Sequence, residues 1–473
     1  MDWFSDPGYW PSRWVFQRGL GLVYLVAFLT AANQFRALIG EHGLTPAPRF
    51  LRGRTLRQVP SLFTLRYSDR RFAIVAWFGV ALSLGALVGL WDRLPLPVCM
   101  AMWALLWVLY LSIVNIGQIW YGFGWESLLL EVGFLAIFLG PAATEPPVLV
   151  LWLLRWVLFR VEFGAGLIKI RGDPCWRNLT CLYYHHETQP MPNPLSWYFH
   201  HLPKPLHRVE AAGNHVVQLV VPFGLFAPQP VAGVAAALMV ATQLWLCVSG
   251  NFAWLNAITI VLGLSVIPGS WYAALPVSAP DLGAPPHWFI ALTVALTAFV
   301  AVLSYRPVRN LLSSHQAMNA SFDKLHLVNT YGAFGRVTRT RFEVVIEGCY
   351  DGTHGTEPEW KQYPFKGKPV DPQRRPRQFA PYHLRLDWLM WFAALSPEYA
   401  RGWLPILADR LLDNDKTTLK LLRGNPFPGR PPDRVRAVLY EYHFTDRAER
   451  RRTGAWWTRE RIGIYLMPRR ASR

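Results

Sequence analysis

One short stretch of the chain concentrates side chains that could transfer protons. It ends an apolar run and continues into a histidine-rich loop. A lysine close to hydrocarbon can lose its charge and act as a base, and imidazole titrates near neutral pH. The candidate catalytic residues are Lys169, His185 and His186, together with Glu162 in the preceding apolar run. In a simpler interpretation, Lys169 lies at a membrane interface with its ammonium reaching water.

The same stretch holds two cysteines and a glycosylation sequon. Cys175 and Cys181 are separated by five residues. This spacing permits a small disulfide loop and also fits two free thiols, so the disulfide is possible but not required. Asn178 begins the sequon Asn-Leu-Thr, which is usable only if the loop reaches the lumen of a secretory compartment.

Histidines are frequent here, yet their spacing predicts no metal site. Six of them fall within residues 185–215. His185 and His186 are adjacent and point different ways on a regular helix or strand, and no HxxxH or HExxH spacing organises the others. We therefore expect neither a bound metal ion nor a cofactor.

Aromatic side chains in this stretch could bind an exposed apolar surface of a partner protein. The candidate partner-binding residues are Trp176, Tyr183, Tyr184 and Trp197. Between them, the three prolines of residues 189–194 cannot continue a helix, because each fixes φ and lacks an amide donor. The segment is therefore expected to turn the chain along the membrane surface as a rigid platform.

The elements that must position these residues are membrane helices. A hydrocarbon core of about 30 Å takes roughly 20 helical residues to cross. Eight apolar runs approach this length: 14–33, 72–91, 97–116, 123–140, 147–170, 231–250, 252–268 and 288–305. A ninth segment, residues 215–226, is too short to cross alone and is expected to be half of a broken helix or a re-entrant turn.

Several charged residues fall inside these runs, where hydrocarbon makes an unpaired charge costly. They are Arg18, Glu131, Arg155, Arg160, Glu162 and Lys169. Two interpretations are open: ion pairs between helices that fix the bundle, or a polar cavity within the membrane that accepts a substrate headgroup or moves a proton.

The tail after the last run has a different pattern. Residues 338–353, 359–369, 433–446 and 454–468 alternate apolar and polar residues as strands do, while 386–395, 398–412 and 415–422 have helical spacing. We therefore predict an α-helical multi-pass membrane bundle of about eight or nine spans in residues 1–305. It contains the polar loop 171–213 and is followed by a linker at 306–329 and a soluble β-rich domain with a helical insertion at 330–473.

Charge limits the partners and bears on orientation. The net charge is +18, but no phosphate loop, zinc-finger spacing or helix-turn-helix accompanies it, so we expect anionic lipid headgroups rather than nucleic acid as partners. Eight arginines in the 34–71 connection place that loop, and with it the 171–213 loop, on the cytoplasmic side by the positive-inside rule.

Long strings of the sequence resemble the lipase maturation factor family. They are residues 172–203 (GDPCWRNLTCLYYHHETQPMPNPLSWYFHHLP), 210–223, 329–348, 384–395 (LRLDWLMWFAAL) and 425–445. The resemblance implies a multi-pass membrane protein that, in eukaryotes, lies in the endoplasmic reticulum membrane and assists folding and assembly of secreted lipases, as a maturation factor rather than a lipase. A bacterial member would lie in the inner membrane, and its client need not be a lipase. The family places the cysteine loop and the tail in the lumen, against the arginine bias.

A shorter likeness supports an alternative function. Residues 165–176 (AGLIKIRGDPCW) resemble the lysine-containing segment of the vitamin K-dependent carboxylase group. That resemblance implies a membrane enzyme acting on a lipid-soluble substrate, with Lys169 as the base. A cavity that brings Lys169, His185 and Glu162 to one ligand would favour it over a maturation factor that binds a client protein.

Overall fold

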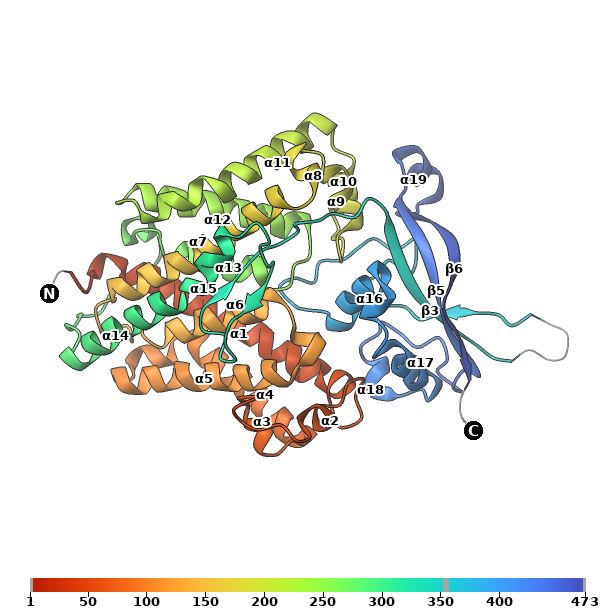
Figure 1. Ribbon diagram of the computed structural model, residues 1–473, viewed down its shortest axis with the longest axis horizontal. Coiled ribbons are helices and arrows are strands. Elements are labelled where there is room, and N and C mark those ends of the chain that lie inside the picture. Colours follow the sequence, from red (N-terminus) through yellow and green to blue (C-terminus); the bar gives the residue numbers. More distant parts are fainter. Residues whose placement is uncertain (1–2, 352–356, 471–473) are drawn as a thin grey trace.

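The computed structural model describes residues 3–351 and 357–470, which form a helical region followed by a mixed β/α C-terminal region (Figure 1). Six helical stretches are long and apolar enough to cross a membrane: 7–38, 69–88, 96–116, 204–226, 231–249 and 287–312. Their main helices are α1 (Trp10–Leu38), α4 (Asp69–Val88), α5 (Leu96–Ile116), α11 (Lys204–Leu219), α12 (Val231–Ser249) and α14 (His287–Leu303). Five of the six coincide with predicted spans.

The remaining stretch, residues 204–226, corrects the prediction for residues 215–226. Helix α11 begins at Lys204 and continues through the 3-10 helix η4 (Val221–Phe226), so the stretch has 23 residues and not twelve. The polar residues near its start made the apolar segment look shorter than the helix, which begins at Lys204 and not at residue 215. Polar side chains affect which solvent a helix faces, but they do not end it. A helix ends where its backbone hydrogen bonds are lost, as at proline. In residues 204–226 proline occurs only near the two ends.

The other three predicted spans are helical but do not have the length and composition of a span. They are α6 (Gly124–Ala136), α7 (Val148–Arg171) and α13 (Leu255–Leu264). Helix α6 has 13 residues and therefore measures about 20 Å, well short of the hydrocarbon core. Helix α7 is long enough but carries several charges. These helices pack inside the bundle, so the described residues support six apolar spans.

Short elements connect the long helices. Before the polar loop they are η1 (Pro7–Tyr9), α2 (Ala47–Leu51), α3 (Leu62–Leu65), η2 (Leu90–Arg93) and η3 (Gln118–Tyr121). Within the loop they are α8 (Pro174–Arg177), α9 (Leu182–Thr188) and α10 (Ser196–His200), and after it η5 (Gly269–Tyr272) and α15 (Tyr305–Leu312). The loop is thus largely helical, and it lies beside the start of α11 (Figure 1).

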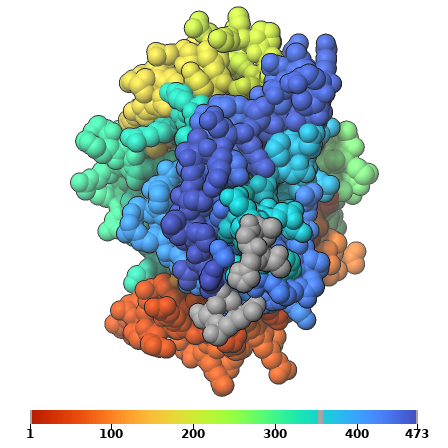
Figure 2. Space-filling model, turned by 90° about the vertical axis from the view of Figure 1, so that its right-hand side faces the viewer, coloured from red at the N-terminus to blue at the C-terminus, as the bar shows by residue number. Residues whose placement is uncertain are grey.

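The C-terminal region is built on an antiparallel sheet with the strand order β4-β3-β5-β6. The strands are β3 (Arg341–Cys349), β4 (Lys361–Gln362), β5 (Arg434–Phe444) and β6 (Trp457–Arg470), and a separate pair is formed by β1 (Ala320–Ser321) and β2 (Asn329–Thr330). Between β4 and β5 lie α16 (Arg385–Leu395), η6 (Pro397–Tyr399), α17 (Leu404–Leu412) and α18 (Lys416–Leu419), with α19 (Arg447–Thr453) before β6. Among the described strands β6 has one neighbour, and it runs openly across the face seen in Figure 2.

A buried ion pair fixes the C-terminal region to the helices. Arg385, at the start of α16, pairs with Glu126 of α6 at 2.8 Å, and both side chains are about 1 % exposed or less. The same guanidinium donates to the carbonyl of Trp120 at 2.5 Å and lies 3.5 Å from the ring centre of Tyr121. The charge of Arg385 therefore holds the start of α16 against residues 120–126, which are far away in the sequence.

A second buried arginine holds the polar loop against the sheet. Arg341 of β3 donates to the carbonyls of Glu187 at 2.8 Å and Gln189 at 2.6 Å. Its charge is balanced by Glu343, which also pairs with Lys368 at 3.0 Å. The proline-rich segment is thus fastened to the C-terminal region rather than lying free along the membrane.

His383, beside the Arg385–Glu126 ion pair, is expected to make the stability of the folded chain sensitive to acid. His383 is fully buried among the rings of Trp125, Trp254 and Trp388, and burial, aided by the charge of Arg385, lowers its pKa well below 6.5. Below pH 6.5 the unfolded chain takes up a proton that the folded chain does not, so stability is lost as pH falls. We expect about 1.4 kcal/mol per pH unit from this group. Chemical unfolding in detergent at pH 7.5 and 5.5 should give a smaller pH dependence for His383→Leu.

Candidate functional site

A large cavity lies where the membrane helices meet the C-terminal region. It has a volume of about 1010 Å³ and is bounded by α7, α11, α12 and α13 on the helical side. Residues 331–336, which follow β2, and the side chains of α16 close it on the other side. Both regions of the chain therefore build one site.

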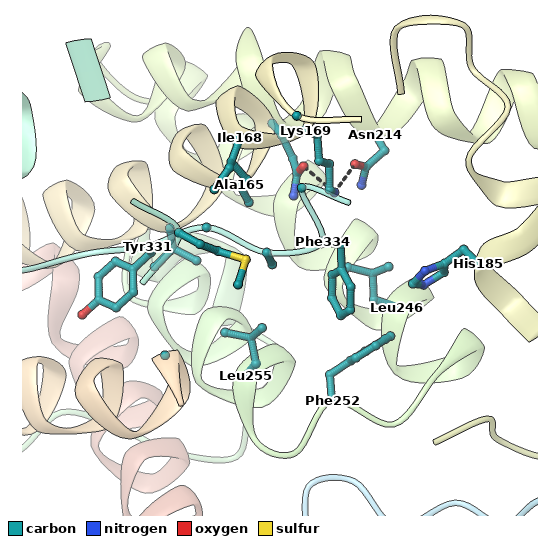
Figure 3. A pocket seen from close by; sticks show the side chains of 18 of the residues that line it. Ala165, Ile168, Lys169, His185, Asn214, Leu246, Phe252, Leu255, Tyr331 and Phe334 are labelled. Carbon is teal, nitrogen blue, oxygen red and sulfur yellow. Dashed lines mark hydrogen bonds between the residues drawn. The ribbon is translucent and has the colours of Figure 1, made fainter. Parts of the chain in front are cut away.

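Most of the wall is apolar. Figure 3 shows Ala165 and Ile168 from α7, Leu246 from α12, Leu255 from α13, and the rings of Phe252 and Phe334 facing the space. Cavities of this size with apolar walls and a few polar groups are typical ligand sites. The lining favours a ligand with a substantial hydrocarbon part.

The polar part of the wall is one hydrogen-bonded network. The ammonium of Lys169 donates to Asn214 at 2.9 Å and to Gln218 at 2.8 Å, as Figure 3 shows for Asn214. The Gln218 amide in turn donates to Glu162 at 3.2 Å, and Gln243 donates to the same carboxylate at 2.7 Å. Gln218 thus links Lys169, the candidate base, to Glu162 within one cavity.

His185 and His186 both line the cavity, but their rings contact different side chains. The ring of His185 lies 6.2 Å from Phe252 and 5.3 Å from Phe334, between centroids. Burial, followed by the charge of Lys169, lowers its pKa to about 4, so the ring is neutral at pH 7. His186 instead stacks on Phe199 at 5.4 Å.

Sequence reasoning missed the uncharged amides of this network. Asn214, Gln218 and Gln243 each supply an oxygen or an amide to the charged pair. The available signal was their place inside apolar helices, where an amide is costly unless it has a partner. The first two are also four residues apart on α11, which puts them on one helix face.

Two other charged residues of the apolar runs pair with each other. Arg160 pairs with Glu131 of α6, and both are about 1 % exposed. Glu131 also accepts from the backbone of Asn329 at 3.0 Å and from the hydroxyl of Tyr331 at 2.6 Å. Arg160 and Glu131 thus form an ion pair between helices, as the first interpretation expects, while Glu162 and Lys169 line the cavity.

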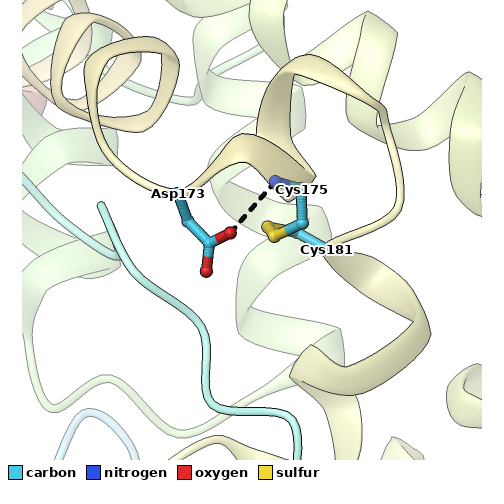
Figure 4. Close-up of side chains that lie close together, drawn as sticks. All are labelled: Asp173, Cys175 and Cys181. Carbon is cyan, nitrogen blue, oxygen red and sulfur yellow. Dashed lines mark hydrogen bonds between the residues drawn. A yellow bond between two sulfur atoms is a disulfide. The ribbon is translucent and has the colours of Figure 1, made fainter.

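The structure joins Cys175 and Cys181 in a disulfide directly after α7 (Figure 4). Asp173 accepts from the backbone amide of Cys175 at 3.0 Å, which begins the short helix α8. Its carboxylate also pairs with Arg339 at 2.8 Å, and these bonds lower the pKa of Asp173. The disulfide loop is thus connected to the segment that leads into β3.

Two of the four aromatic residues proposed to bind a partner are buried. Trp176 donates to the carbonyl of Phe334 at 2.8 Å, and Trp197 donates to the carbonyl of Thr445 at 2.8 Å. Their indole rings hold the loop to the C-terminal region, so a client could reach them only after that contact opens. Tyr183 and Tyr184 are half-buried and remain accessible in part.

Six apolar helices of spanning length, a mixed β/α region fastened to them and a cavity at the junction define a multi-pass membrane protein. Residues 11–274 match the model of the lipase maturation factor transmembrane domain, and residues 327–468 match the model of the lipase maturation factor C-terminal domain. The chain belongs to the lipase maturation factor family.

Individual relatives agree over nearly the full length. The chain is 42% identical to human lipase maturation factor 1, over 97% of this chain and 88% of the relative. It is 41% identical to the mouse protein of the same name, and 29% identical to human lipase maturation factor 2 over 96% of this chain and 82% of that relative. No solved structure matches the chain significantly.

Proposed function

We propose that the chain is a membrane-embedded maturation factor that assists the folding and assembly of secreted lipases or similar clients. The observation that carries the proposal is the similarity to human lipase maturation factor 1, which extends through both the helical region and the C-terminal region. In a eukaryotic cell the protein would lie in the endoplasmic reticulum membrane, and in a bacterium in the inner membrane. We also propose that residues 306–329 are a linker between a domain of membrane helices at 1–305 and a soluble domain at 330–473.

The client surface that we propose is the open strand β6. Its side chains Ile462, Ile464 and Met467 are 50, 40 and 72 % exposed. An unpaired strand edge offers backbone donors and acceptors to an extended client segment, and neighbouring apolar side chains add affinity. A strand that is still unpaired in a folding client has the matching chemistry.

Complementation tests the proposal. Cells from which lipase maturation factor 1 has been removed are expected to regain secreted lipase activity when they express this chain. Ile462→Lys with Ile464→Lys should reduce both the activity and client co-purification about tenfold, because interface anchors contribute on the order of 1 kcal/mol or more each. Arg461→Ala is the matched control. Full accumulation of the chain without any gain in secreted activity would reject the function.

We propose further that the disulfide loop and the C-terminal region face the lumen or periplasm. A disulfide persists in oxidising compartments, which supports this side against the arginine bias of the 34–71 connection. Asn178 of the sequon is exposed, so the chain made in eukaryotic cells should carry a glycan that Asn178→Gln removes. In microsomes Asn178→Cys should resist an impermeant maleimide until detergent is added. Labelling of Asn178→Cys in intact microsomes would show that the disulfide loop faces the cytoplasm instead.

A second candidate function is a membrane enzyme that uses Lys169 as base. It is supported by the placement of Lys169, His185 and Glu162 on one largely apolar cavity. Against it, the ammonium of Lys169 already donates to two amide oxygens, whereas a base has to be neutral and accept a proton. The complementation assay separates the two functions. If the chain is a non-enzymatic maturation factor, Lys169→Met should leave the secreted lipase activity per folded chain unchanged. If it is an enzyme that uses Lys169 as base, the same substitution should abolish that activity.

A further inference from the structure

Two buried histidines and a carboxylate meet at the edge of the cavity. His186 comes from α9, while His207 and Glu210 lie three residues apart on α11 and so share one helix face. One ligand atom from each residue can be chosen so that all three lie within 4.8 Å of one another. His186 and Glu210 also line the cavity.

The histidine nitrogens lack partners within the described part of the chain. Each ring is about 1 % exposed, and none of the four ring nitrogens makes a hydrogen bond of good geometry there, although the backbone of His200 approaches His207. Burying a polar group without a partner is unfavourable. A ligand that accepts lone pairs would remove this cost.

Aromatic packing alone does not account for the cluster. His186 stacks on Phe199 at 5.4 Å, and His207 makes an edge-to-face contact with Tyr183 at 5.9 Å, both between ring centroids. Such contacts use the faces of the rings and leave the nitrogens at the rim unsatisfied. A neutral buried imidazole in this state is a suitable metal ligand.

The carboxylate is oriented as metal ligands usually are. Trp245 of α12 donates from its indole nitrogen to one oxygen of Glu210 at 2.7 Å, and within the described residues no side chain donates to the other oxygen. Outer hydrogen bonds of this kind fix a ligand and raise its affinity for the ion.

We propose that His186, His207 and Glu210 bind one divalent transition-metal ion, with zinc the best fit. Two histidines and one glutamate are a ligand set of zinc sites that keep an open position. Bonds of about 2.1 Å in a tetrahedron place ligand atoms roughly 3.4 Å apart, so binding draws the three groups together slightly. The open position would be reachable from the cavity. The inference goes beyond the maturation function and does not depend on it.

Histidine spacing alone predicts no metal site here, because no HxxxH or HExxH pattern organises these residues. The site uses an HxxE pair from one helix and a histidine from another, and only the fold brings them together.

Metal analysis of the full chain in detergent tests the proposal. The chain should be purified with a histidine-free affinity tag and without chelator. We expect about one zinc per chain, retained after gel filtration, and loss of the metal in His186→Gln, His207→Gln and Glu210→Gln. His201→Gln is the matched control, because its ring is engaged by the carbonyl of Trp197 at 2.7 Å. Trp245→Phe should keep the site but weaken zinc binding about tenfold.

A second measurement needs no variant. Cobalt(II) added to the metal-free chain should give the visible absorption of a four-coordinate ion, which zinc then displaces. A wild-type chain with no transition metal and no cobalt spectrum would overturn the proposal, and so would equal metal content in the three ligand variants. Another first-row ion at one equivalent that is lost in those variants would support the site.

Discussion

Replacing Arg385 with methionine is expected to lower the free energy of unfolding by about 3–5 kcal/mol, because it leaves the carboxylate of Glu126 buried without its partner. The carbonyl of Trp120 loses its donor as well. Chemical unfolding of the detergent-solubilised chain measures the loss. Hydrogen exchange across residues 327–341 should rise in the same variant, since the C-terminal region is then less firmly attached.

An exposed pair provides the control for this prediction. Arg401 and Glu398 form an ion pair on the surface of the same region, so Arg401→Met should change stability little. Replacing both Arg385 and Glu126 by apolar residues should recover part of the loss, because no charge is then left unpaired. Equal stability of Arg385→Met and the wild-type chain would mean that this ion pair does not fix the C-terminal region.

Glu131→Ala should cost a similar amount, about 3–5 kcal/mol, and should also change the cavity. The carboxylate holds Arg160 of α7 and accepts from Asn329 and Tyr331, so its removal leaves several buried donors without an acceptor. We expect the segment at residues 329–331 to separate from the helices. An environment-sensitive apolar probe bound in the cavity would then show a fluorescence change that accompanies the drop in unfolding free energy.

The matched control for Glu131 is a less buried pair. Arg18 pairs with Asp92, and these side chains are 15 and 20 % exposed, so Arg18→Met should cost less than Glu131→Ala. A loss at Glu131 no greater than the loss at Arg18 would contradict the role assigned to this carboxylate.

The sequence predicted the elements better than their roles. The strand expected at 433–446 is β5 at Arg434–Phe444, and the span expected at 97–116 is α5 at Leu96–Ile116. Periodicity and the length of an apolar run are local properties, so they can be read from neighbouring residues. Hydropathy does not say whether an apolar helix faces lipid or protein, which is why the short buried helices α6 and α13 were taken for spans.

The site depended on pairs that are distant in sequence. Asn329 meets Glu131 across 198 residues, and His186 meets Glu210 only because the polar loop folds back onto α11. Lys169, Glu162 and His185 were found from their residue types, but the amides that connect the first two required the packing of α11 and α12 against α7. Residue type thus indicated candidates, and tertiary contact determined which of them share a cavity.

The attachment of Arg385 also has a consequence for how the chain is made. The residue donates to the carbonyl of Trp120 from 265 positions further along the chain. At about 5–20 residues per second, the ribosome needs roughly 13–50 s to supply it after Trp120 has been added. Throughout that interval Glu126 has been inserted without its cation, so the nascent protein must remain partly open at this point until Arg385 has been added.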